Sequence, residues 1–242
     1  HANSIVDKVA FKAGEKVGQD VSRFFFGILQ SVLTDLDNDS WSSIWQPSIA
    51  DSDQNKYRDN AEHIVVKACR NSLQGFAKVD PDNTLIFLDE IFEAGFQTFD
   101  RIAIHTISEN FRMYGALAHK VVKPNYFSSN YRHEVWHLLN DNYRNFDDEL
   151  KKLTLEIIIN LKSEDEEGNL REGATFYERA VWLSAIKDQD ESLLVLYLDC
   201  VEKAGAEPDH PDFSSYISSG WVQHESPISL DELQALSVDQ LI

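Results

Sequence analysis

Residues 17–32 read VGQDVSRFFFGILQSV, and the spacing of their apolar side chains decides the expected fold. Residues three or four positions apart lie on one face of an α-helix, so apolar side chains at this spacing form a stripe that packs against a core. The stripe here consists of Val17, Val21, Phe24, Phe25, Ile28 and Val32. We therefore predict one long amphipathic helix in this segment.

Similar stripes recur along the chain, whereas the alternation typical of β-strands is almost absent. Asp80 and Pro81 mark one helix start, and Thr175 with Glu178 has the spacing of a capping box. The run 193–201 is apolar nearly all round, which predicts a helix in the centre of the packing. We expect an all-α fold of irregular antiparallel helical hairpins, stacked as a HEAT-like solenoid or as a compact helical domain.

The chain is expected to form one continuous domain with two regions. Residues 1–80 hold long helices and an acidic loop, and residues 81–242 hold the array of helical hairpins. The chain shows no fixed-period repeat of the ankyrin or tetratricopeptide type. It begins at His1 rather than Met, and a helix-start signal at Ser237 lies too close to Ile242 for a helix. We therefore expect either a longer native polypeptide or a terminal turn that docks there.

The 242-residue chain is strongly acidic, with a formal net charge of −19 at pH 7. Residues 1–121 hold 17 acidic and 12 basic side chains and residues 122–242 hold 24 and 10, so the halves carry −5 and −14. Nucleic-acid binding needs Lys and Arg to displace counterions, so DNA and RNA partners are not expected.

Neither a membrane segment nor an oxidising compartment is expected from the sequence. The uncharged run 24–34 is only about half of the roughly 20 residues that a membrane-spanning helix needs. Cys69 and Cys200 offer neither a disulfide framework nor a CxxC site. We therefore expect a cytoplasmic protein.

The segment His133-Glu134-Val135-Trp136-His137 matches the HExxH pattern of zinc hydrolases. On a helix, the two histidines share a face and could bind zinc, while the glutamate acts as general base toward a metal-bound water. However, Val135 and its apolar neighbours lie opposite the histidines, so both imidazoles are expected to face solvent or a partner helix. The nearest suitable third ligand downstream is Glu156, in a segment unlike the glutamate helix of zinc peptidases. We therefore favour an amphipathic helix and assign no catalytic residue, cofactor or metal, with a hydrolase using His133, Glu134 and His137 as the alternative.

Other candidate sites are weaker. Asp35-Leu-Asp-Asn-Asp39 begins like a calcium loop, but the pattern then requires Gly at Ser40 and Glu at Gln46. His105 and His119 are each expected to be surface or hydrogen-bonded residues. The sequence contains no P-loop, dinucleotide-binding glycine pattern or GxSxG elbow.

Three segments resemble the α-helical regions of large bacterial defence proteins. They are DRIAIHTI at 100–107, RHEVWHLL at 132–139, and the stretch that runs from HPDF at 210–213 through Gly220-Trp221 to SPISLDELQALS at 226–237. The family comprises the antiviral STAND-type NTPases and the related sirtuin-like multidomain proteins. The resemblance implies a helical array that follows nucleotide-binding and effector modules and senses a phage protein. It also implies that the HExxH-like helix is used for packing.

We therefore expect a non-catalytic helical scaffold or sensor segment that binds a protein partner or other domains of a longer chain. The helix Tyr131–Trp136 and the region of Trp221 are the candidate surfaces. A stand-alone acidic helical regulator is a further alternative, beside the zinc hydrolase.

Overall fold

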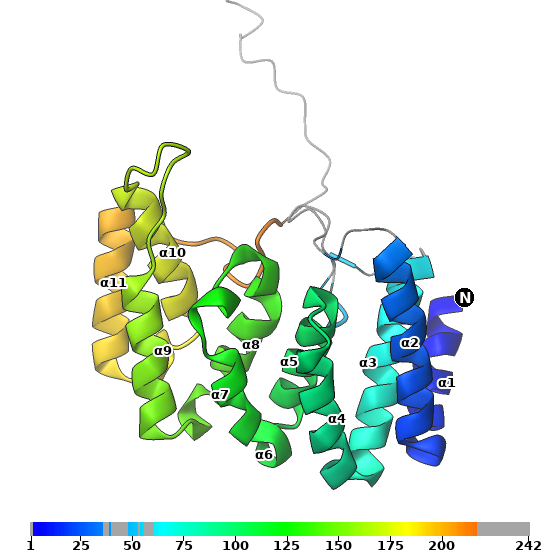
Figure 1. The fold of residues 1–242 in the computed structure, drawn as a ribbon. Coiled ribbons are helices and arrows are strands. Elements are labelled where there is room, and N and C mark those ends of the chain that lie inside the picture. Colours follow the sequence, from blue (N-terminus) through cyan, green and yellow to red (C-terminus); the bar gives the residue numbers. More distant parts are fainter. Residues whose placement is uncertain (1, 36–38, 40–47, 53, 56–60, 217–242) are drawn as a thin grey trace, which may run out of the picture.

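The computed structural model describes residues 2–35, 39, 48–52, 54–55 and 61–216, and this part of the chain is all-α (Figure 1). An isolated bridge between Glu164 and Leu170 is the extent of β-structure among these residues. The predicted fold class is confirmed. The helices are α1 (Ala2–Val17), α2 (Gln19–Asp35), α3 (Ala61–Val79), α4 (Pro81–Glu93), α5 (Gln97–Glu109), α6 (Phe111–Tyr114), α7 (Ala118–Val121), α8 (Arg132–Asn142), α9 (Asp148–Asn160), α10 (Glu172–Ser184) and α11 (Glu191–Ala204).

The helices follow one another in a row from α1 and α2 at one end to α11 at the other (Figure 1). Each packs mainly against helices near it in sequence, as in the pairs α1 with α3, α5 with α8, and α10 with α11. A continuous cluster of buried apolar side chains extends along the row from Phe26 to Cys200. Among the described residues, no helix has the length and apolar character needed to cross a membrane.

The helix predicted over residues 17–32 is present as α2, but its start and its buried face differ from the prediction. The chain turns at Gly18, whose φ of 72° lies in the left-handed region, so α1 ends at Val17 and α2 begins after the turn. In α2, Phe26 and Leu29 enter the core, whereas Phe24 is 61% exposed. Two apolar stripes overlap on this helix, and the buried one contains Phe26, Leu29 and Leu33 rather than Phe24.

The helices α1 and α3 approach each other closely at two glycines. A Cβ atom on Gly14 would lie 2.1 Å from the carbonyl oxygen of Ser72, and one on Gly75 would lie 2.1 Å from the carbonyl oxygen of Phe11. Both contacts are with backbone, so a side chain at either position cannot be accommodated by a rotamer change. The absence of a Cβ therefore sets the distance between these helices.

The predicted helix start at Asp80 and Pro81 is confirmed, and the predicted capping box in α10 is wrong. The Asp80 carboxylate accepts a hydrogen bond from the amide of Asn83, and the Asp147 carboxylate accepts one from that of Leu150. The helix α10 begins at Glu172, before Thr175, which is buried and accepts a hydrogen bond from the amide of Ser163. The hydroxyl thus binds the loop between α9 and α10, which contains Ser163, instead of capping the helix.

The helix α11 is an outer helix rather than the predicted central one (Figure 1). Its inner face, with Leu193 and Tyr197, packs on α10 and the short turn before it. Its other face exposes Leu194, Val195 and Leu198, which are 38%, 62% and 54% accessible. Apolar residues all round a helix normally indicate burial on every side, but the described residues cover only one side of this helix.

Candidate functional site

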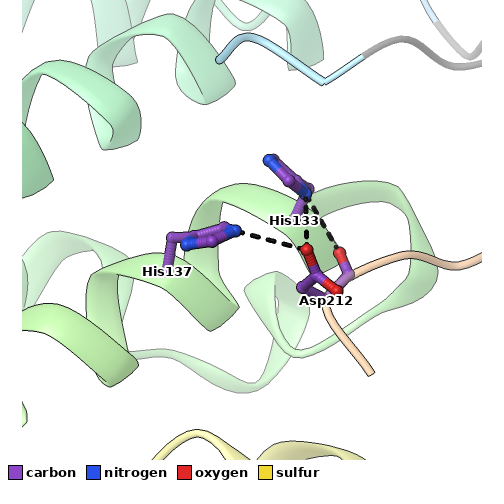
Figure 2. A group of neighbouring side chains, drawn as sticks. All are labelled: His133, His137 and Asp212. Carbon is purple, nitrogen blue, oxygen red and sulfur yellow. Dashed lines mark hydrogen bonds and ion pairs between the residues drawn. The ribbon is translucent and has the colours of Figure 1, made fainter. Parts of the chain in front are cut away.

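The three described segments that carry the family resemblance meet in one place. Residues 100–107 lie in α5 and residues 132–139 in α8, and these helices pack against each other. Residues 210–213 follow the last helix and return to α8, where Asp212 lies beside His133 and His137 (Figure 2). Segments far apart in sequence thus form a cluster of charged and aromatic side chains.

The centre of this cluster is a buried ion pair between α5 and α8. The Arg101 guanidinium donates from Nε to Glu134 Oε2 at 2.7 Å and from Nη2 to Glu134 Oε1 at 2.9 Å. The amide of Ile49 also donates to Glu134 Oε1 at 2.9 Å. The two charged side chains are only 4% and 1% exposed. Burial alone would raise the pKa of Glu134, but the positive charge of Arg101 outweighs it and keeps the pKa below its usual value.

These contacts bear on the HExxH interpretation. A general base needs a free carboxylate oxygen directed toward the metal-bound water. Both oxygens of Glu134 instead accept hydrogen bonds from Arg101 and Ile49. The carboxylate of Glu134 is therefore engaged by Arg101 and Ile49, whereas the hydrolase hypothesis requires it to act on a metal-bound water.

The two histidines of the motif face a carboxylate that was not assigned from the sequence. Asp212 Oδ2 lies 3.6 Å from His133 Nδ1 and 3.4 Å from His137 Nε2, and the Asp212 carbonyl oxygen lies 3.2 Å from His133 Nδ1 (Figure 2). Glu156, the nearest downstream carboxylate in the sequence, is an exposed residue of α9 and is not part of this group. Asp212 belongs to the HPDF segment of the family resemblance, and its place after the last helix is the one sequence feature that points to it.

The exposure of His133 also differs from the expectation. It was expected to face solvent or a partner helix, but it is only 9% accessible because residues 210–216 cover it. The ring of Phe213 lies 4.6 Å from that of His133, centroid to centroid. Burial lowers the pKa of His133. Burial also acts to lower the pKa of His137, but the hydrogen bond and charge of Asp212 outweigh it and raise that pKa.

A loop from the N-terminal region closes the other side of the cluster. Arg70, on α3, donates to the carbonyl oxygen of Ile49 at 2.8 Å and pairs with Asp51 at 3.1 Å. Lys67 pairs with the same carboxylate at 3.0 Å. Burial would raise the pKa of Asp51, but these two cations lower it overall. The loop that holds Ile49 against Glu134 is thus fixed by charges on α3.

Beside the ion pair, Asp100 is a second carboxylate removed from water. Its Oδ2 accepts hydrogen bonds from Tyr126 and Tyr131, at 3.0 and 3.3 Å, whereas its Oδ1 is buried without a hydrogen-bond partner among the described residues. Burial raises the pKa of Asp100 to about 6, with a smaller contribution from the negative charge of Asp39, although the two tyrosine hydrogen bonds oppose the shift. The ionised form is therefore disfavoured in the folded chain.

The replacement Asp100→Asn tests how much the ionised carboxylate destabilises the folded chain, because this effect depends on pH. Well below the ordinary aspartate pKa of 3.8 the carboxyl group is protonated in both states, and as the pH rises from there toward 6 the unfolded chain ionises first, so wild-type stability falls. The full shift corresponds to about 3 kcal/mol, and solvent screening reduces our expectation to about 1–2 kcal/mol. We expect the unfolding free energy of Asp100→Asn minus that of wild type to rise by this amount between pH 4 and 7.5, measured by urea denaturation. A difference that stays constant with pH would contradict the assignment.

The remaining candidate residues have structural partners or lie outside the described residues. His105 lies 3.2 Å from Gln74, ring nitrogen to amide nitrogen, and burial lowers its pKa to about 4. His119 pairs with Asp147 at 3.2 Å, on the rim of an open cleft of about 820 Å³ between α6 and α9. Asp39 of the calcium-like run accepts hydrogen bonds from the amide and hydroxyl of Thr98, at the start of α5. Ser40, Gln46 and Trp221 lie outside the described residues.

Comparisons with models of protein families, with curated proteins and with solved structures find no match. Membership of the antiviral family therefore stays a prediction from the sequence.

Proposed function

We propose that this chain is a non-catalytic helical scaffold that binds an amphipathic helix of a partner protein on the outer face of α11. The observation that carries the proposal is the exposed stripe of Leu194, Val195 and Leu198. These residues lie at positions i, i+1 and i+4, so their side chains form one patch on the helix. Clustered exposed aliphatic side chains in otherwise polar surroundings are typical of protein interaction sites.

The charges beside this stripe indicate the chemistry of the partner. Exposed Glu191 and Glu202 lie at its two ends, one turn from the nearest aliphatic residue. Lys203, the cation that α11 itself carries, is paired with Asp199 at 2.7 Å. A helix with an apolar stripe flanked by Lys or Arg is therefore complementary. A second copy of this chain is disfavoured, since each copy carries a net charge of −19.

The absence of a catalytic role is part of the same proposal. It is supported by the engagement of both oxygens of Glu134 with Arg101 and Ile49, since the HExxH interpretation needs this carboxylate as the base. The role in bacterial antiviral defence that the family resemblance implies is compatible with such a scaffold.

Two synthetic amphipathic peptides with the same leucine stripe, one flanked by lysines and the other by glutamates, test the proposal. We expect the basic peptide to bind the purified chain, with an affinity that falls as salt rises. The double variant Val195→Asp/Leu198→Asp is expected to weaken binding at least about 10-fold, because charges then occupy the centre of the interface. Fluorescence anisotropy of labelled peptides measures both effects.

The matched control is Ile86→Asp on α4, an equally exposed apolar residue at 56% accessibility on a different part of the row. It is expected to leave binding unchanged. Equal binding of the acidic peptide, or an equal loss in the Ile86 variant, would rule out the α11 site. Self-association of the wild type that is lost in the α11 variant would assign the stripe to a second copy instead.

A further inference from the structure

We infer that His133, His137 and Asp212 form a binding site for a divalent transition-metal ion of the Zn²⁺ class, which ties the segment 210–216 to α8. Each of the three residues offers one ligand atom, and these atoms all lie within 4.8 Å of one another. Two of the residues share one face of α8, and the third comes from a different part of the chain (Figure 2). The inference is independent of the partner site proposed on α11.

The distances around Asp212 are close to those of a tetrahedral zinc site. Ligand atoms about 2.1 Å from a tetrahedral ion are about 3.4 Å from each other. Asp212 Oδ2 lies 3.4 Å from His137 Nε2 and 3.6 Å from His133 Nδ1. All three ligand atoms lie within 4.8 Å of one another, so ion binding would draw the two imidazole nitrogens and the carboxylate oxygen closer together.

The ligand types select the class of metal. Two imidazoles with one carboxylate suit Zn²⁺ and other late first-row ions, whereas Ca²⁺ and Mg²⁺ prefer oxygen ligands alone. A small cavity of about 60 Å³ borders both rings and is lined also by Glu109 and Asp141, so water can reach an open position on the ion. These two carboxylates add negative charge, while the charges of Arg101 and Glu134 are paired with each other.

The position of the site indicates a structural rather than hydrolytic role. Glu134 also lines the small cavity beside the histidines, but its carboxylate is engaged by Arg101 and by the amide of Ile49. Residues 210–216 contact the rest of the chain around this site. Asp212 lies beside the two histidines, and the ring of Phe213 lies against that of His133. Ser214 Oγ donates a hydrogen bond to the carbonyl oxygen of Ser129. An ion would join this segment to α8 through three bonds.

The same contacts also fit an ordinary pair of a histidine and an aspartate without metal, and zinc titration separates the two interpretations. The full chain is dialysed against EDTA, transferred to chelator-free buffer and titrated with Zn²⁺ in a calorimeter. We expect about one ion per chain, and an affinity at least about 10-fold lower in Asp212→Asn and in His137→Ala. These residues are chosen because their side chains are partly exposed, at 21% and 38%, whereas a change at buried His133 threatens folding.

His119→Ala is the matched control, since His119 also pairs with an aspartate, at 3.2 Å, and its side chain is 43% exposed. It is expected to bind zinc as the wild type does. As a second readout, Co²⁺ is expected to show the intense visible absorption of a low-symmetry four-coordinate site in the wild type and to lose it in Asp212→Asn. The absence of saturable zinc binding, or an equal loss of affinity in the His119 variant, overturns the inference. Circular dichroism confirms that each variant is folded.

Discussion

The variant Glu134→Ala is expected to unfold about 3–5 kcal/mol more easily than the wild type, the range typical of breaking a buried ion pair from one side. The side chain of Arg101 is only 4% exposed, and Glu134 supplies its bidentate carboxylate. Removing the carboxylate leaves a guanidinium charge in the core and also leaves the amide of Ile49 without its acceptor. Urea denaturation followed by circular dichroism measures the loss.

Two further variants show whether the loss arises from the stranded charge. Glu90→Ala removes the partner of Arg23 in a pair whose side chains are 47% and 41% exposed, and it should cost less than about 1 kcal/mol. The double variant Arg101→Met/Glu134→Leu should regain much of the stability, because no uncompensated charge remains. A single Glu134 variant as stable as the Glu90 variant would mean that water reaches Arg101.

Helices were the part of the structure most predictable from the sequence, because local chemistry determines them. Asp80 and Asp147 each cap the helix that follows, because the carboxylate accepts a hydrogen bond from an amide three residues further on. Which face of a helix is buried depends on the helices packed against it. Periodicity alone therefore predicts the stripe with Phe24, whereas Phe26 enters the core. The capping box predicted at Thr175 is wrong for a similar reason, since the Thr175 hydroxyl accepts its hydrogen bond from Ser163, outside the helix.

The candidate site was less predictable, for two physical reasons. Periodicity assigns charged residues to the solvent side of a helix, so it gives no sign that Arg101 and Glu134 neutralise each other inside the core. The face of α8 that bears His133 was correctly placed opposite Val135, but residues 210–216 cover it. This segment is irregular, and because irregular segments have no period, their docking positions cannot be derived from a single sequence.

The second large effect is expected at the contact between α1 and α3. Gly14→Ala and Gly75→Ala should each destabilise the chain by about 3 kcal/mol or more, which is the upper end of the range for an added methyl group in a packed core. In both variants the new methyl group would lie 2.1 Å from a backbone carbonyl oxygen, so the helices must separate. Separation also loosens the dispersion contacts along the interface. Thermal and urea denaturation measure the change.

Gly27→Ala is the control, because Gly27 lies inside α2 and a Cβ atom there has no neighbour within 4 Å. It should stabilise the chain by about 0.5–1 kcal/mol through helix propensity alone. The two contact glycines lie on facing helices, so the separation that accommodates one methyl group also makes room for the other. The double variant Gly14→Ala/Gly75→Ala should therefore cost clearly less than the sum of the single variants. Strict additivity would show instead that each methyl group is accommodated by a local distortion and that the helices do not move apart.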